Sequence, residues 1–67
     1  MLEDQIKQYI GKFGIITTEG EFPKTIPGVI KEIDGRNNIW FLDNDGQVYM
    51  FKADEVVSFE EKELEIK

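Results

Sequence analysis

The sequence predicts a mainly β fold, a small antiparallel barrel of five strands preceded by a short N-terminal helix. Three observations predict it: a single amphipathic stretch near the N-terminus, several short β-branched or aromatic runs separated by turn residues, and a length of only 67 residues. A chain of this length forms one domain, and closing a short sheet into a barrel removes its exposed edges. We therefore expect one domain over residues 1–59 and a charged tail, extended or frayed, over residues 60–67.

The N-terminal segment has the apolar spacing of a short helix. Apolar side chains recur at i, i+4, i+7 and i+8, at Leu2, Ile6, Tyr9 and Ile10. Gly11 follows the last of them and is a residue type that commonly ends a helix. The spacing predicts a helix over residues 2–10, which is too short to persist alone and must dock on the rest of the domain.

Two strands are expected next. From residue 12 to about residue 19 the sequence alternates and is rich in β-branched residues, which favours a first strand. Residues 21–27 contain Pro23 and Pro27, which cannot both belong to a central ladder, so this stretch is expected to be a loop or an edge segment. A second strand is expected over residues 28–33.

Two turn signals bracket the third strand. The dipeptide Asp34-Gly35 ends the second strand, and residues 43–46 (DNDG) follow the continuous apolar run of residues 39–42. An apolar run without alternation is typical of a strand covered on both faces, or of one whose outer face meets a partner. The glycine of the DNDG turn supplies the positive φ of a tight hairpin, as a type I′ turn or a type I turn with a bulge.

The last two strands complete the predicted sheet. Residues 48–51 form the second arm of the hairpin, residues 52–55 allow a brief break, and residues 56–59 form a last short strand. Beyond this strand the sequence becomes strongly charged, which is why residues 60–67 are expected to be a tail.

A helix leading into residues 9–12 (YIGK), followed by residues 28–34 (GVIKEID), 38–43 (NIWFLD) and 51–59 (FKADEVVSF), resembles the Sm-like small barrel and, more generally, an SH3-like barrel. The resemblance covers the chain up to Phe59. It implies a ring of six or seven subunits in which loops around the pore carry nucleotide pockets.

Two short motifs carry this resemblance. In the Sm-like family the first ends in an acidic residue followed shortly by an asparagine, which Asp34 and Asn37 or Asn38 match here. The second is a basic residue and a glycine before the last strand, and Lys52 matches the basic residue. The resemblance thus implies a possible nucleotide site formed by Arg36, Asn37, Asn38 and Lys52, with a stacking aromatic ring.

The chain departs from the family pattern at several points. Ala53 stands where the family has glycine, Arg36 stands where an apolar residue is usual, and two prolines interrupt the segment before the second strand. Fourteen acidic and eight basic residues give a net charge of −6, whereas nucleic-acid binding normally needs a basic footprint. The acidic charge fits a protein partner better than RNA.

The composition also limits chemistry. Without cysteine or histidine the chain has no disulfide, no thiolate nucleophile, no cysteine-based zinc or iron–sulfur site, no histidine metal ligand and no near-neutral acid or base. The DNDG turn fails as a calcium loop, because Phe41 and Lys52 occupy the positions of the first and last ligands. No pair of carboxylates stands out for acid/base work. We expect no catalytic residue, no metal site and no cofactor.

The N-terminus lacks the basic start and apolar core of a signal peptide. No run approaches the roughly 18 apolar residues that a membrane span needs. We expect no membrane association and a cytoplasmic location.

Aromatic residues gather around the predicted hairpin of the third and fourth strands, and alternation sends them to both faces of the sheet. The main hypothesis is a non-enzymatic small-barrel binding module that acts through protein–protein interaction or self-association. Its predicted interaction surface consists of Trp40, Phe41, Tyr49 and Phe51. One alternative is an Sm-like oligomer that binds RNA or a small nucleotide, and another is an acidic regulator or inhibitor of a basic, nucleic-acid-binding partner.

Overall fold

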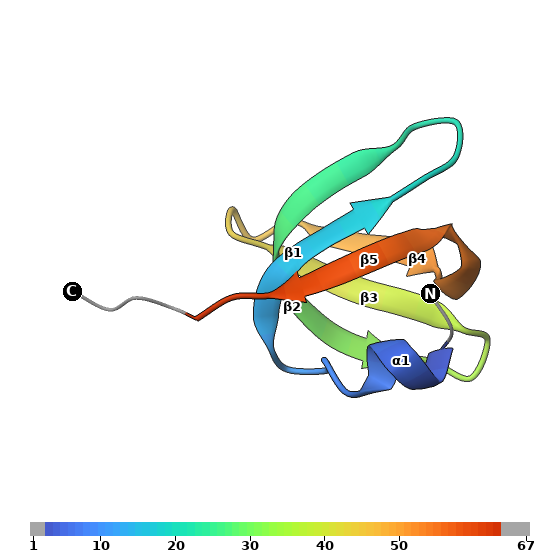
Figure 1. Cartoon of the computed structure of the whole chain (residues 1–67), viewed down its shortest axis with the longest axis horizontal. Coiled ribbons are helices and arrows are strands. Elements are labelled where there is room, and N and C mark those ends of the chain that lie inside the picture. Colours follow the sequence, from blue (N-terminus) through green and yellow to red (C-terminus); the bar gives the residue numbers. More distant parts are fainter. Residues whose placement is uncertain (1–2, 64–67) are drawn as a thin grey trace.

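The structure is a strongly curved antiparallel sheet with a short helix at one end (Figure 1). It is a computed structural model that describes residues 3–63. The elements are α1 (Glu3–Lys7), β1 (Phe13–Thr18), β2 (Lys24–Ile33), β3 (Asn38–Asp43), β4 (Val48–Lys52), the 3-10 helix η1 (Ala53–Glu55) and β5 (Val56–Glu61). Across residues 3–63 no helix has the length and apolar character that crossing a bilayer requires.

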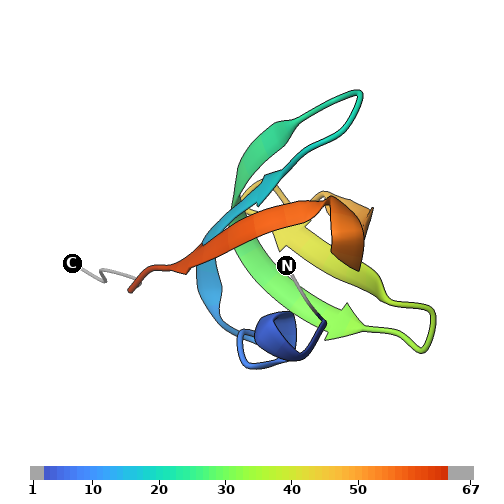
Figure 2. The same cartoon turned by 45° about the vertical axis from the view of Figure 1, so that its right-hand side comes forward.

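All five strands belong to one sheet, in the order β4-β3-β2-β1-β5. The strands from β1 to β4 pair as successive hairpins, and β5 returns to pair with β1. The predicted mainly β fold with five antiparallel strands and one short helix is confirmed. The predicted closure into a barrel is not confirmed, because β4 and β5 are the two edges of the sheet. The sheet nevertheless curls strongly, as Figures 1 and 2 show.

The helix α1 is shorter than the predicted helix over residues 2–10. After α1 the backbone closes tighter turns, with hydrogen bonds between residues three positions apart. Ile10 has left the helix and forms a parallel bridge with Ile30 of β2. As a result Ile6 is fully buried while Ile10 is 41% exposed. Leu2, the first member of the predicted apolar stripe, lies outside the described residues.

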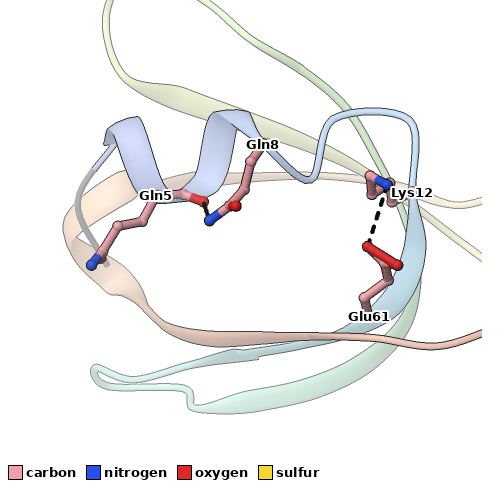
Figure 3. Close-up of polar contacts among 4 residues, drawn as sticks. All are labelled: Gln5, Gln8, Lys12 and Glu61. Carbon is pink, nitrogen blue, oxygen red and sulfur yellow. Dashed lines mark hydrogen bonds and ion pairs between the residues drawn. The ribbon is translucent and has the colours of Figure 1, made fainter.

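Polar contacts fix the segment that follows α1 (Figure 3). Gln8 Nε2 donates to the carbonyl oxygen of Gln5 at 3.0 Å. Lys12 Nζ lies 3.5 Å from Glu61 Oε1, so this segment is tied to the end of β5. Both partners of this ion pair are about half exposed, and such pairs contribute at most about 1 kcal/mol. This ion pair therefore adds little stability to the segment, and α1 itself is docked by the burial of Ile6 in the core.

The core fills the inner face of the curled sheet. Its buried apolar residues are Ile6, Ile16, Ile30, Ile39, Phe41, Phe51, Ala53, Val56 and Phe59. Tilted ring contacts connect the elements, with centroid distances of 5.0 Å between Tyr9 and Phe59 and 6.4 Å between Phe41 and Phe51. Along β3, buried residues alternate with partly exposed ones, so the apolar run of residues 39–42 supplies both faces of the sheet.

Gly14 and Gly28 face each other across β1 and β2, and both are buried. A Cβ at Gly14 would lie 2.6 Å from the ring of Phe59, and a Cβ at Gly28 would lie 2.8 Å from the ring of Phe41. Either Cβ would also overlap the backbone of the neighbouring strand. The absence of both side chains therefore lets the sheet bend tightly around the two rings.

The first residues of β2 lie where the sequence predicts a loop or an edge segment. Residues 24–27 pair with β1 alone, because β3 begins to pair with β2 at Gly28. The stretch is therefore an edge, and Pro27 is tolerated there without a break in a central ladder. Together with the end of β1 and the connecting bend it forms a projecting hairpin, which we call the β1–β2 arm (residues 18–27; Figure 1).

The strand β5 runs two residues past its predicted end at Phe59. Glu60 and Glu61 pair with β1, and Lys62 donates its backbone N–H to a carbonyl of β1 at 2.9 Å. The first two residues of the predicted tail (residues 60–67) are therefore part of β5, because their backbone pairs with β1. Residues 64–67 lie outside the described residues.

We expect Gly14→Ala to lower the free energy of unfolding by about 1–3 kcal/mol, because the new methyl group would clash with the ring of Phe59 and with backbone. Urea or thermal unfolding measures the change. Gly35→Ala is the matched control, since nothing lies within 4 Å of a Cβ there; its effect should stay within about 0.5 kcal/mol. Equal stability of the two variants would contradict the role of Gly14.

Candidate interaction surface

The turns that begin at Asp34 and Asp43 have the same architecture. The backbone N–H of the fourth residue, Asn37 or Gly46, lies 3.2 Å from the carbonyl oxygen of the aspartate in each turn. These fourth residues have φ of 60° and 86°, and Asn37 is the one non-glycine residue with positive φ among those described. Both are type I turns with a bulge, which is one of the two forms predicted for residues 43–46.

The aspartate side chains stabilise both turns. Oδ1 accepts the backbone N–H groups of the residues two and four positions later, at 2.8 and 3.1 Å for Asp34 and at 2.9 and 2.8 Å for Asp43. The carboxylates thus accept hydrogen bonds from backbone N–H groups of the turns. Aspartate is favoured at such positions for this local role. Among residues 3–63 no three acidic side chains are arranged to hold a metal ion.

Asp34 also positions an aromatic ring. Its Oδ2 accepts hydrogen bonds from Asn38 Nδ2 at 3.1 Å and from Trp40 Nε1 at 3.2 Å. The pKa of Asp34 falls to about 2, chiefly because the backbone N–H of Arg36 donates to the carboxylate; desolvation opposes this, and the donors of Asn38 and Trp40 lower it further. At neutral pH an ionised carboxylate therefore holds the indole of Trp40 in place.

The possible nucleotide-site residues lie close together at this end of β3. Asn38 pairs directly with Lys52 across β3 and β4, and the carbonyl of Asn37 accepts a hydrogen bond from the residue after Lys52 at 3.0 Å. Arg36, Asn37 and Lys52 are exposed. The side chain of Asn38 is bound to Asp34, so the cluster consists of two exposed cations beside one ionised carboxylate.

The four residues of the predicted interaction surface do not form one surface. Phe41 is fully buried and Phe51 is 6% exposed, so both belong to the core and are removed from the prediction. Trp40 lies on the opposite face and is partly exposed. Tyr49 lies at the margin of the core face, with its ring stacked on Phe51 at a centroid distance of 5.8 Å. Strand alternation separates the set.

The hydroxyl of Tyr49 forms a hydrogen bond next to the turn that begins at Asp43. It donates to Gln47 Oε1 at 2.8 Å. Desolvation raises the pKa of Tyr49, and the nearby negative charges of Asp43 and Asp45 raise it further. The phenol is therefore protonated at neutral pH and acts as a structural donor.

The outer face of the sheet carries an apolar surface that contains Trp40 but none of the other three residues of the predicted interaction surface. Successive cross-strand partners on β4, β3, β2 and β1 form an apolar row of Val48, Leu42, Val29 and Phe13. The pair Met50 and Trp40 flanks this row on one side, and the pair Pro27 and Ile15 flanks it on the other. We call these eight residues the outer apolar face.

None of the eight residues of the outer apolar face is buried. Val48 is 62% exposed and Met50 is 50% exposed. The signal that identifies this face is strand register, which places residues far apart in sequence in one row. Register across four strands is not visible in any single segment of the sequence.

No protein-family model, no curated protein and no solved structure matches this chain significantly. The Sm-like and SH3-like resemblance therefore stays a prediction based on the order of elements and on two short motifs.

We expect acid to detach Trp40 from Asp34. The folded pKa of about 2 lies below the ordinary value of 3.8, so the stabilising contribution of Asp34 is present above about pH 4 and is lost as pH falls towards 2. Trp40 is the only tryptophan, so its fluorescence should change with a midpoint near pH 2.

Asp34→Asn should abolish this fluorescence step and flatten the dependence of stability on pH between about pH 2 and pH 4. Asp45→Asn is the control and should retain the step, because Asp45 does not contact Trp40 through a hydrogen bond. A wild-type midpoint near the ordinary aspartate value would contradict the assignment.

Proposed function

We propose that this chain is a non-enzymatic binding module that acts through protein–protein interaction or self-association, and that it docks through the outer apolar face. The observation that carries the proposal is the row of four apolar partners across four strands, with Val48 62% exposed. Contiguous apolar patches of this kind on small proteins are typical of interaction sites.

Trp40 supports the proposal as an anchor. Tryptophan is enriched among the residues that dominate binding energy, and a side chain already held in one orientation loses less entropy on binding. Here the hydrogen bond to Asp34, at 3.2 Å, fixes the indole on the outer apolar face before any partner arrives.

The surroundings of the outer apolar face also fit a protein interface. On the same face of the sheet, the pair beyond Met50 and Trp40 is Lys52 and Asn38, and the pair beyond Pro27 and Ile15 is Thr25 and Thr17. An apolar centre with a polar rim is the usual arrangement at such interfaces.

We expect Val48→Lys to weaken association at least about tenfold, because it places a charge at the exposed β4 end of the apolar row. Val57→Lys is the matched control, with the same change at a site that is 49% exposed on β5 and outside the row. Sedimentation measures self-association, and titration with a protein co-purified on the wild-type chain measures partner binding.

Val48 is exposed enough for the lysine variant to fold, which circular dichroism would verify. A folded Val48→Lys chain with the same self-association and the same partner affinity as wild type would overturn the outer apolar face as the docking site. Equal weakening in the Val57→Lys control would overturn it as well.

A second candidate function is binding of single-stranded RNA or a small nucleotide at the cluster of Arg36, Asn38 and Lys52. The observation that favours it is register: the exposed Lys52 lies on the same face as Trp40, one pair along β3 and β4, and the exposed Arg36 lies in the turn before β3. Phosphate contacts together with a stacking ring are the usual elements of such sites. The acidic net charge of −6 and the ionised Asp34 weigh against it.

If this second function holds, Lys52→Glu should weaken binding of labelled single-stranded oligoribonucleotides about equally for all sequences, because a phosphate contact carries no base information. Fluorescence anisotropy at two salt concentrations measures it. Lys24→Glu makes the same charge change on the β1–β2 arm and should have a smaller effect. An absence of salt-dependent binding by the wild-type chain would exclude this function.

A further inference from the structure

A groove separates the β1–β2 arm from the free edge of β4. It is lined by Glu19, Glu21, Phe22 and Lys24 of the arm, by Met50 of β4 and by Glu55 of η1, and its volume is about 380 Å³. Figure 1 shows the arm projecting away from the body of the sheet. A volume of this size accommodates one or two side chains of a bound segment.

Hydrogen bonds fix the walls of the groove. The backbone N–H of Lys24 donates to Thr18 Oγ1 at 3.1 Å, where the arm leaves the sheet. The backbone N–H of Glu19 donates to the carbonyl oxygen of Glu55 at 2.8 Å, which joins the arm to η1. The groove is therefore preformed, and a ligand that binds in it does not have to order the walls first.

Large apolar side chains are exposed at the groove. Phe22 is 75% exposed and Met50 is 50% exposed. The neighbouring Phe51 also contacts the groove and belongs to the core. An aromatic ring and a flexible thioether at one opening are well suited to pack against the alkyl part of a bound side chain.

The charge of the groove selects the chemistry of its occupant. Three carboxylates, of Glu19, Glu21 and Glu55, and the single ammonium of Lys24 leave a local net charge of −2. None of these four groups forms an ion pair within the described part of the chain. Because these carboxylates line one groove, their fields add and attract a cation jointly.

We propose that this groove binds a short basic segment of a partner protein, in which arginine or lysine flanks an apolar residue. The cationic groups pair with the three carboxylates, the alkyl stems pack on Met50, and a guanidinium stacks on the ring of Phe22. This inference goes beyond the proposed function and stands independently of it, since the two surfaces share only Met50. It assigns a role to part of the acidic charge of the chain, namely the binding of cationic side chains in this groove.

The test is a titration of the full chain, labelled with ¹⁵N, with the N-acetylated and C-amidated peptide Lys-Arg-Leu-Arg-Lys. Amide shifts should concentrate at residues 18–22, 24, 50–51 and 55, and affinity should fall as salt rises. The triple variant Glu19→Gln, Glu21→Gln, Glu55→Gln should bind at least about tenfold more weakly, and Phe22→Ser should bind several-fold more weakly.

The matched control is the triple variant Glu32→Gln, Asp45→Asn, Asp54→Asn, which removes the same total charge from residues outside the groove. It should change affinity less than about twofold. Val48→Lys should also leave peptide binding within about twofold, so failure of the outer apolar face and failure of the groove are distinguishable.

Three results would overturn the proposal. Equal weakening by the two triple variants would show a general charge effect. Shifts centred on the outer apolar face would show that the peptide docks elsewhere. Displacement of the peptide by millimolar Mg²⁺ or Ca²⁺, with the same pattern of shifts, would show that the carboxylates bind small cations and do not recognise a peptide.

Discussion

The curvature of the sheet depends on the facing pair Gly14 and Gly28. Their missing side chains leave room for the rings of Phe59 and Phe41, so the sheet can bend tightly and close its inner face around the core. The same bend makes the opposite face convex, and the outer apolar face spreads over that convex side. The curl stops before β4 meets β5, and the groove lies beside the edge of β4 that stays free. One steric constraint thus positions both proposed binding surfaces.

Local patterns were sufficient to predict the elements, and long-range contacts decided their limits. The helix, the five strands and the turn at residues 43–46 follow from periodicity and turn chemistry. The helix ends early because Ile10 bridges to Ile30, and β5 runs late because Glu60 and Glu61 pair with β1. Closure of the sheet depends on whether two distant edges meet, which no segment of the sequence encodes by itself.

For the candidate sites too, short motifs predicted some of the residues, and long-range strand register decided the others. The Sm-like resemblance implied a cluster of Arg36, Asn38 and Lys52, and strand register brings these residues to one end of β3. The faces of residues 39–42 could not be assigned, because a continuous apolar run has no alternation to follow; Phe41 was therefore expected on an interaction surface and lies in the core. The outer apolar face and the groove are both composed of residues from several strands, so they became visible only when register and the β1–β2 arm were known.

The strand order has a consequence for synthesis of the chain. Pairing from β1 to β4 joins strands that are adjacent in sequence, whereas the pairing of β1 with β5 joins Gly14 to Glu61, 47 positions apart (61 − 14). Local hairpins close at a lower entropic cost than such a distant contact. On the ribosome, the meander of β1 to β4 can therefore form while one edge of β1 is still unpaired and Gly14 is uncovered. The ring of Phe59 completes the domain only when the C-terminal strand emerges, so the nascent chain passes through a stage with an aggregation-prone open edge.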